Sequence, residues 1–528
     1  MSEERQGRSM AEGKMRERLM IGKNEMQDWL KENKGIIAFV LIMAAYYGWR
    51  MFALEPWYDE LYTYYSFISK GPIYAAIHWP VPNNHVFYSV LSGCLMILGN
   101  PYLALRGISW LFSVGNLIML YYLARRFFSK SLSLGCVVLY SSFYLVNYLS
   151  IQGRGYTLSI GFYLLAIIML YHIGMEEGAG LKYYLVFSLS LTAGLYTVPS
   201  NVYWVLPLCL AGGLYLLLQK EIRTLLRLIL ASVIGAINTL GLYSLIWLAI
   251  GSNLLSKTPD SGYFGIYQVK IILQAPFTAW KRGMDYMLAS PYVQSMDRGV
   301  VISDFFSWFS GLMNLFVSSI GSLLTILLAV SGILCVVGVI RGFRKREKNR
   351  VFLYLYLGSM LWGLPLMLMV QAVQPYYRVF TFLGIPISLL IMSYLSAIKK
   401  ERWESFICVG ILVWTLGQLT SSYYNGNYAD REVKIKEIWE RAGIEQVESI
   451  CFMDDYQKYV LQFYWGLRPV EAAQEEAEYI LLPKEVQEEV NQAPAWPILY
   501  NYESVNWEYL DSCRIVAESD SYILYQRN

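Results

Sequence analysis

The chain has 528 residues, of which 56% are hydrophobic and only 16% are charged, whereas about 25% of the residues of an ordinary soluble protein are charged. Its net charge of +3 is too small to indicate a nucleic-acid-binding protein. The composition therefore excludes a soluble globular protein and predicts a protein that lies mostly within a membrane.

The apolar residues gather in long blocks, and each such block predicts a membrane-spanning helix. About 18 largely uncharged residues suffice to cross a bilayer, and a helix satisfies its own backbone polar groups where there is no water. We expect about eleven spans in an all-α bundle. In chain order they are residues 36–54, 107–124, 132–150, 158–174, 183–200, 202–218, 225–250, 312–340, 351–372, 379–398 and 403–421.

Two further apolar stretches, residues 85–99 and 263–280, are interpreted as helices at the outer interface or packed on the bundle. If only one of them crossed the membrane, every later connection would change sides. With eleven spans, four connections rich in Lys and Arg lie on the same side as the N-terminal tail. These connections are residues 125–130, 220–227, 341–350 and 399–402. Positive charge favours the cytoplasmic side, so this side is expected to be cytoplasmic.

The sequence divides into three parts. Residues 1–35 are polar and are expected to form a cytoplasmic tail, and residues 36–422 are expected to form the transmembrane domain. Residues 423–528 are predicted to form a small α/β domain outside the membrane, opposite the tail. In this last part, helical patterns alternate with strand patterns. The helical patterns are residues 430–442 and 454–465, and the strand patterns are 449–453, 479–482 and a terminal hairpin over 513–525.

The first outer loop, residues 55–106, carries an acidic pair, Asp59 and Glu60, beside the aromatic Tyr58. One carboxylate of such a pair can take a proton from an incoming hydroxyl, while the other orients it, binds a metal ion or pairs with a cation. The pair can also simply mark the point where the chain leaves the bilayer.

Further along this loop, His85 opens an apolar helical pattern, with Asn84 as a possible N-cap. A helix N-terminus beside a histidine suits an anion, although a capped helix with an incidental histidine is equally ordinary.

Three arginines, Arg106, Arg154 and Arg378, are expected at the outer ends of spans. A single arginine at such a place usually reaches toward the lipid headgroups. Three of them on the side that carries Asp59 and Glu60 instead indicate a phosphate site, because the guanidinium fork matches phosphate oxygens.

The order of these motifs resembles the GT-C class of membrane glycosyltransferases. The nearest resemblance is to bacterial relatives of dolichyl-phosphate-mannose protein mannosyltransferases and of the lipid A aminoarabinose transferase. The motifs that carry the resemblance are Asp59-Glu60, Asn84-His85, Leu105-Arg106-Gly107-Ile108-Ser109, Ala124-Arg125-Arg126, Arg154-Gly155-Tyr156 and Tyr377-Arg378. The chain departs from the family at Val86-Phe87, Gln152-Gly153 and Val379, which leaves the donor sugar and the acceptor open.

The resemblance implies a bacterial plasma-membrane enzyme that moves a hexose or pentose from a polyprenyl phosphate to a hydroxyl of a glycan, lipid or protein at the outer face. It implies inversion at the anomeric carbon, with Asp59 as the catalytic general base and Glu60 beside it orienting the loop or positioning a cation. Arg378 and Arg154 would hold the lipid phosphate with help from His85 and Arg106. Asn84 and Tyr58 would serve the acceptor or the loop. A divalent cation near the acidic pair is compatible with this scheme but is not required.

Two other interpretations stay open at this point. A transporter or lipid flippase would carry charges near the middle of broken helices and would show paired repeats; the informative charges of this chain lie at the outer ends of its spans. A scaffolding protein of the cell envelope would make the acidic pair accidental.

Overall fold

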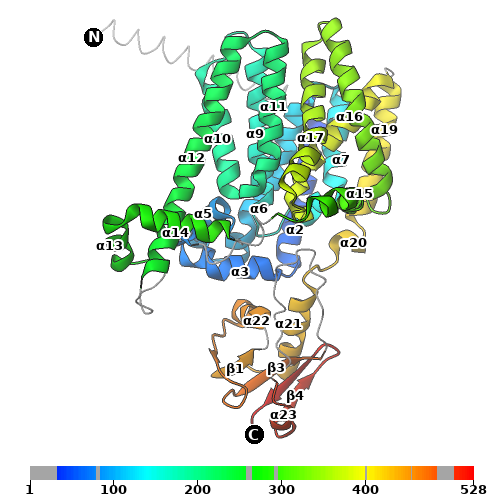
Figure 1. Ribbon diagram of the computed structural model, residues 1–528. Helices are drawn as coiled ribbons and strands as arrows, with labels where there is room; N and C mark the ends of the chain where they lie inside the picture. Colours follow the sequence, from blue (N-terminus) through cyan, green and yellow to red (C-terminus); the bar gives the residue numbers. More distant parts are fainter. Residues whose placement is uncertain are drawn as a thin grey trace, which may run out of the picture.

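The computed structural model describes residues 32–78, 84–256, 264–289, 295–398, 401–452, 455–484 and 505–528. The N-terminal tail predicted over residues 1–35 therefore lies almost wholly outside the described residues. The described chain forms a helical bundle, with a small domain containing a β-sheet at one end (Figure 1). The predicted fold class, a membrane-type α-helical bundle followed by a small C-terminal domain, is confirmed.

Eight helical segments of the described chain are long and apolar enough to cross a membrane. They are α2 (Lys34–Ala53), α6 (Pro101–Ala124), α9 (Tyr156–Met175), η3 (Pro199–Asn201) with α11 (Val202–Leu218), α12 (Ile222–Leu255), α16 (Gly321–Arg344), α17 (Lys348–Gln371), and α18 (Gly384–Leu395) with η5 (Tyr377–Leu383) before it and η6 (Ser396–Ile398) after it.

Three other predicted spans form helices outside this set of eight. The span predicted over residues 132–150 is divided into α7 (Lys130–Ser142) and α8 (Tyr144–Leu149). The remaining two are α10 (Leu181–Thr197) and α19 (Glu401–Leu419), which also lie in the bundle (Figure 1). The count of eleven stays a prediction.

The span predicted over residues 312–340 is wrong at its beginning. Helix α15 (Arg298–Asn314) ends there and runs across the end of the bundle, and the chain turns before α16 (Figure 1). The turn is tight, because the backbone N–H of Gly321 donates to Oδ1 of Asn314 at 2.7 Å. A Cβ at Gly321 would lie 2.2 Å from the carbonyl oxygen of Ser310, so only glycine allows this approach.

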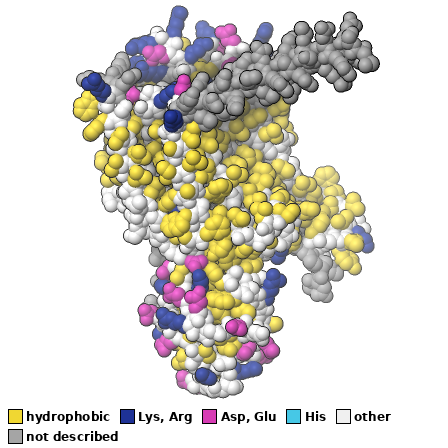
Figure 2. All heavy atoms as spheres, turned by 180° about the vertical axis from the view of Figure 1, so that it is seen from behind, with side chains coloured by type: hydrophobic (Ala, Val, Ile, Leu, Met, Phe, Trp, Pro, Cys, Tyr) yellow, Lys and Arg dark blue, Asp and Glu magenta, His cyan; other side chains and the backbone are white. Residues whose placement is uncertain are grey.

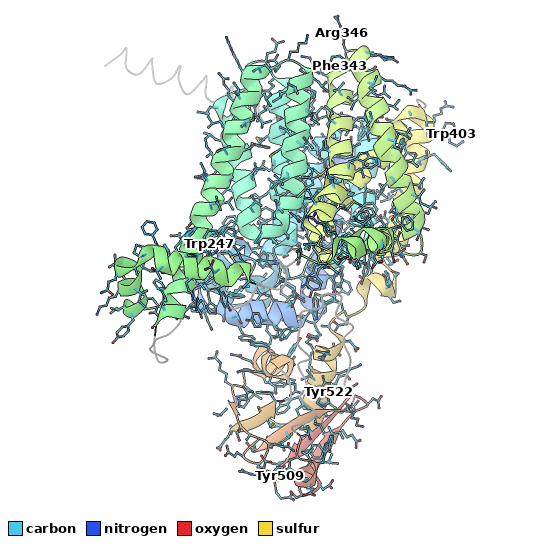
Figure 3. The ribbon with its side chains drawn as sticks, in the orientation of Figure 1. Trp247, Phe343, Arg346, Trp403, Tyr509 and Tyr522 are labelled. Atoms are coloured by element: carbon cyan, nitrogen blue, oxygen red, sulfur yellow. The ribbon has the colours of Figure 1, made fainter. Side chains whose placement is uncertain are left out.

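The two ends of the bundle differ in chemistry. Phe343 and Arg346 lie at one end of the bundle (Figure 3). The C-terminal domain, where Tyr509 and Tyr522 lie, is at the other end. Figure 2 shows Lys and Arg side chains gathered at the end where Phe343 and Arg346 lie, and apolar side chains over the flank between it and the C-terminal domain. A band of exposed apolar side chains is the surface that a bilayer covers.

Short helices lie across the end of the bundle that faces the C-terminal domain. From the first outer loop come α3 (Tyr58–Ser66), η1 (Ile68–Lys70), α4 (Pro72–Ile77), α5 (Val86–Cys94) and η2 (Leu95–Leu98). Helices α13 (Ile266–Gln274) and α14 (Pro276–Leu288) extend to the side at the same level (Figure 1). The two apolar stretches that were not predicted to span, residues 85–99 and 263–280, are thus short helices where they are described.

The C-terminal domain holds a five-stranded sheet of order β2-β1-β3-β5-β4. Strand β1 pairs in parallel with β2 and β3, whereas β5 pairs antiparallel with β3 and β4. The strands are β1 (Ser449–Phe452), β2 (Val470–Glu471), β3 (Tyr479–Pro483), β4 (Arg514–Glu518) and β5 (Tyr522–Gln526), and the helices of this part are α20 (Ser422–Asn425), α21 (Asp430–Ala442), α22 (Asp455–Trp465) and α23 (Trp507–Asp511).

The C-terminal domain packs against the first outer loop and forms a hydrogen bond with it. The side chains of Tyr58 and Leu61 are buried in the hydrophobic core of the domain, beside Ile435 and Leu461. The backbone N–H of Tyr58 donates to a carboxylate oxygen of Glu432 at 2.8 Å. The domain therefore helps to fix helix α3, on which the acidic pair lies.

Candidate active site

The acidic pair lies in the first turn of α3, which is closed by a local hydrogen bond. The backbone N–H of Trp57 donates to Oε2 of Glu60 at 3.0 Å, so the glutamate caps its own helix. Successive helical residues are about 100° apart around the axis. Asp59 and Glu60 therefore point toward different partners, although they are adjacent in sequence.

Glu60 forms a fully buried ion pair with Arg106 of α6. Nε of Arg106 lies 2.8 Å from Oε1 of Glu60, and both side chains are 0% exposed. The same guanidinium donates to the carbonyl oxygens of Met51 and Leu54, at 2.9 and 2.7 Å. It also donates to the hydroxyl of Tyr428, 2.9 Å away. Because its donors are used inside the protein, Arg106 braces the loop and does not face an open phosphate site.

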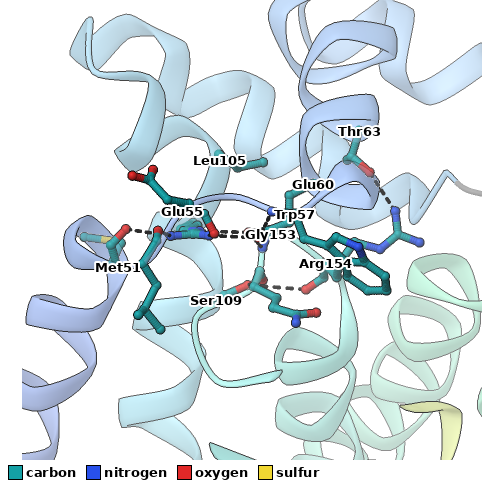
Figure 4. Close-up of polar contacts among 12 residues, drawn as sticks. Met51, Glu55, Trp57, Glu60, Thr63, Leu105, Ser109, Gly153 and Arg154 are labelled. Atoms are coloured by element: carbon teal, nitrogen blue, oxygen red, sulfur yellow. Dashed lines mark hydrogen bonds and ion pairs between the residues drawn. The ribbon is translucent and has the colours of Figure 1, made fainter. Parts of the chain in front are cut away.

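Glu60 also fixes the turn before α9. The backbone N–H of Gly153 donates to Oε1 of Glu60 at 2.6 Å (Figure 4). A Cβ at Gly153 would lie 2.4 Å from the side chain of Leu105, so glycine is needed for this approach. The result is that Arg154, the next residue, is held beside α3.

Breaking the buried pair is expected to destabilise the protein. In Glu60→Gln the charge of Arg106 loses its counterion, so we expect the free energy of unfolding to fall by about 3–5 kcal/mol. Thermal unfolding of the purified variant in detergent would show this as a lowered midpoint. The matched control is Glu347→Gln, which breaks a largely exposed pair with Arg350 and is expected to cost about 0–1 kcal/mol. Equal midpoints for the two variants would contradict the bracing role.

Asp59 faces the bundle and pairs with Arg378 of η5. Nη1 of Arg378 lies 2.7 Å from Oδ2 of Asp59, and the two side chains are 24% and 17% exposed. The guanidinium also lies over the rings of Trp57 and Tyr376, 5.6 and 4.9 Å from their centroids. Oδ1 of Asp59 has no hydrogen bond to any residue of the described chain, so it can accept one from another group.

Arg154 and His85 complete the group around Asp59. Nη1 of Arg154 donates to the Thr63 hydroxyl at 2.7 Å and to the backbone oxygen of Asp59 at 3.3 Å. Its Nη2 lies 3.3 Å from Nε2 of His85. The backbone N–H of Gly155 donates to Nδ1 of His85 at 2.8 Å. Nδ1 is therefore an acceptor, and the proton of a neutral ring is on Nε2.

The charges of the group set the protonation of both titratable side chains. Burial raises the pKa of Asp59, but the Arg378 and Arg154 guanidiniums outweigh it and hold this pKa below its ordinary value. Burial, reinforced by the same two arginines, holds the pKa of His85 well below its ordinary value. At neutral pH the group thus contains one carboxylate, two guanidiniums and an uncharged imidazole.

The other predicted site residues hold the loop together. The side-chain amide of Asn84 donates to the carbonyl oxygens of Ala75 and His78, at 2.9 Å each, and its Oδ1 accepts from Ser89 at 2.8 Å. Tyr58 packs into the C-terminal domain. Neither side chain faces the space beside Asp59.

The acidic pair does not offer a ready metal site. Both oxygens of Glu60 accept hydrogen bonds from the protein. Within the described ranges, no group of three or more His, Cys, Asp or Glu side chains is placed to hold a metal ion. The donor set therefore does not fit the cation that the resemblance allowed near Asp59 and Glu60.

Some residues of this region were not found from the sequence. Thr63 binds Arg154, and Trp57 and Tyr376 stack on Arg378. In the sequence, only their positions next to the predicted site residues point to these three side chains. Tyr428 contacts Glu60 at 3.1 Å across more than 360 residues of chain, and nothing local in the sequence indicates such a contact.

Comparison with known proteins gives one family match. Residues 85–247 match the family model described as dolichyl-phosphate-mannose-protein mannosyltransferase. This range contains His85, Arg106 and Arg154 but not Asp59 or Arg378. No curated protein sequence matches the chain.

Solved structures of two kinds align with most of the chain. ArnT from Cupriavidus metallidurans, in a crystal structure with bound undecaprenyl phosphate, is 11% identical; the alignment covers 93% of this chain and 97% of that one, with a TM-score of 0.41. The Archaeoglobus fulgidus oligosaccharyltransferase in its apo form is 11% identical over 85% of this chain and 69% of that one, with a TM-score of 0.43. The family match over residues 85–247 agrees with the resemblance to dolichyl-phosphate-mannose protein mannosyltransferases that the motifs predicted.

Proposed function

We propose that the protein transfers a sugar from a polyprenyl-phosphate carrier to an acceptor hydroxyl at the outer membrane face. The observation that carries the proposal is the convergence of Asp59, Arg378, Arg154 and His85 at one end of an apolar bundle. The group lies beside α3, at the end of the bundle that faces the C-terminal domain (Figure 1). Lys and Arg side chains gather at the opposite end (Figure 2), which the positive-inside rule assigns to the cytoplasm.

The group has the donors that an anion requires. Nε of Arg378 is buried without a hydrogen-bond partner among the described residues. Nδ1 of His85 accepts from Gly155, so Nε2–H is a donor, and it lies 3.3 Å from Nη2 of Arg154; one acceptor oxygen between them can therefore take a hydrogen bond from each. A phosphate oxygen is such an acceptor, and its charge would offset that of the two arginines.

The reaction needs one proton acceptor and no general acid. The acceptor oxygen attacks the anomeric carbon, the bond from that carbon to the phosphate oxygen breaks, and the polyprenyl phosphate leaves as an anion. The proton of the attacking hydroxyl passes to a carboxylate oxygen of Asp59. Attack on the face opposite the leaving phosphate inverts the anomeric carbon. The two arginines stabilise the negative charge that develops on the leaving group.

The ion pair between Asp59 and Arg378 couples binding to catalysis in this scheme. A carboxylate paired with a guanidinium is a weak base, because the partner favours its charged form. A donor phosphate that draws the guanidinium of Arg378 toward itself weakens the pair and makes Asp59 more basic. The base is then strengthened when the donor is present.

The protonation states predict how binding depends on pH. Because the pKa values of Asp59 and His85 both lie below their ordinary values, neither group titrates between about pH 6 and 8. We therefore expect the affinity for the phosphodiester donor to stay constant over this range. The product, polyprenyl phosphate, is a phosphomonoester. Its second proton is expected to leave near pH 6, as that of a phosphoserine does (second pKa about 6). Its affinity should accordingly rise with pH, because the dianion interacts more strongly with two arginines.

Titrations of both lipids by native mass spectrometry at several pH values would check this difference. A donor affinity that changes with a midpoint near the ordinary pKa of histidine would show that His85 titrates, against the environment described above.

A transfer assay tests the function itself. Purified protein in lipid nanodiscs would receive a panel of polyprenyl-phosphate-linked hexoses and pentoses, with an envelope fraction as the acceptor source. We expect at least one donor to release its sugar and to yield free polyprenyl phosphate. In a parallel measurement with liposomes, movement of intact donor across the bilayer without any sugar release would establish a flippase and reject the proposal.

A further inference from the structure

A cavity lies beside α3, where the first outer loop meets the C-terminal domain. Its volume is about 360 Å³, and it is open to solvent. Residues of α3 and η1, of η2 and the turn that leads into α6, and of the end of α22 with the loop that follows line it. The lining residues used below are Tyr64, Tyr65, Asn100, Gln462, Phe463 and Arg468.

Aromatic rings form the walls of this cavity. The ring of Tyr65 stacks on that of Tyr459, with an interplanar angle of 5° and centroids 5.5 Å apart. Tyr64 meets Phe463 edge to face at 6.0 Å, and Tyr102 meets the same ring at 5.2 Å. The rings are thus held in place by one another across the junction between the loop and the C-terminal domain.

The cavity also contains polar groups that the protein leaves unused. The side chains of Gln462 and Arg468 make no hydrogen bond or ion pair with any residue in the described ranges. Oδ1 of Asn100 caps α6 by accepting from the N–H of Leu103 at 3.1 Å, whereas its amide N–H groups have no partner in the described chain. Amide and guanidinium donors therefore line a space that is walled by aromatic rings.

We propose that this cavity binds a sugar unit. A pyranose ring has a C–H face that packs on an aromatic ring, which is electron-rich at its face, and a rim of hydroxyls that exchange hydrogen bonds with amides and guanidiniums. A purely apolar ligand would leave the donors of Gln462 and Arg468 unused. A bare anion would make no use of the ring walls and, among the described lining residues, would meet a single cation, the exposed Arg468.

The position of the cavity relative to Asp59 on α3 indicates which part of the substrate the bound sugar belongs to. Tyr64 and Tyr65 follow Asp59 by five and six residues, so they lie about 8–9 Å along the helix and more than 100° around it. The cavity is therefore displaced along and around α3 from Asp59, and we assign it to a neighbouring unit of the acceptor glycan and not to the sugar that reacts at Asp59. The assignment to the acceptor rests on the proposed function, whereas sugar binding itself does not.

Binding is tested without turnover. Full-length Asp59→Asn protein in lipid nanodiscs, free of sugar-headed detergent, would be titrated with the methyl glycosides of glucose, mannose, galactose, N-acetylglucosamine and arabinose, using saturation-transfer NMR. We expect at least one glycoside to receive saturation. Adding Arg468→Gln or Tyr65→Ala should reduce that signal at least five-fold. The matched controls Arg514→Gln and Tyr74→Ala, on residues outside the cavity, should leave it unchanged.

The exposed position of Arg468 makes Arg468→Gln safe for folding, and an unchanged unfolding midpoint would confirm this. Absence of a signal with all five glycosides, or a signal that survives both cavity substitutions, would overturn the proposal. Sugar binding by a protein that fails the transfer assay would reject the proposed function and leave the sugar site standing. Transfer by a protein that binds none of the glycosides would reject the sugar site alone.

Discussion

Replacing Asp59 with Asn is expected to lower sugar transfer by about 100- to 10,000-fold, the usual contribution of a general base. Asparagine keeps the size of the side chain and can still accept a hydrogen bond from Arg378, but it cannot take a proton from the acceptor. Because Asp59 is 17% exposed and its pair with Arg378 is not fully buried, we expect the variant to fold. Donor binding should persist, since the arginines remain and one negative charge beside them is removed.

The measurement is the initial rate of polyprenyl phosphate release, compared with the wild type at saturating donor. Asp430→Asn is the matched control, because the Asp430 carboxylate is 72% exposed and pairs with Lys434 of the same helix. It should transfer at the wild-type rate. Retention of more than a third of the wild-type rate by Asp59→Asn would show that another group accepts the proton.

The second large effect is expected at Arg378. Charge-assisted hydrogen bonds each contribute about 1.5–3 kcal/mol, so Arg378→Ala should weaken donor binding by about 10- to 150-fold. Arg378→Lys keeps the charge but loses the planar fork and its stacking on Trp57 and Tyr376, so a smaller but clear loss is expected. An arginine that merely reached for headgroups would be replaced by lysine without effect.

Donor titrations on Asp59→Asn protein separate binding from turnover, with the Arg378 substitutions added in turn. Arg298→Lys is the control, because Arg298 begins α15 at the same end of the bundle and is exposed. Donor affinity should be the same with and without this control substitution. Unchanged affinity in both Arg378 variants would remove this residue from the phosphate site and leave Arg154 as the remaining arginine.

The helices of the bundle could be predicted because hydropathy is a local property. A run of apolar residues such as those in α9 or α16 is sufficient to indicate a span. The turn between α15 and α16 could not be read in this way, since both sides of it are apolar. It depends on the contact of Gly321 with Ser310 and Asn314, which is set by packing.

The gathering of Asp59, His85, Arg154 and Arg378 in one place could be predicted in part. Charge placed all four on one side of the membrane, and the structure brings them into contact. The separate use of Glu60 and Arg106 could not be predicted, because composition does not show which arginine a carboxylate faces. Their pairing follows from the rotation of about 100° between neighbours on α3.

Contacts between the C-terminal domain and the first outer loop could not be predicted from the sequence either. Lys436 pairs with Glu55 at 2.7 Å, and Tyr428 binds both members of the buried pair. These residues are more than 300 positions away from their partners, and no periodicity or spacing connects them. They show that the domain is part of the frame that holds α3.

The central claim is that one cluster of side chains holds the carrier phosphate beside the base. Its most direct test is a cryo-EM structure of Asp59→Asn protein in a lipid nanodisc with the polyprenyl-phosphate sugar that the transfer assay selects. We predict phosphate oxygens within about 3 Å of the side-chain nitrogens of Arg378, Arg154 and His85, with the anomeric carbon facing residue 59. A phosphate bound elsewhere, such as among the basic residues near Arg346, would contradict this account.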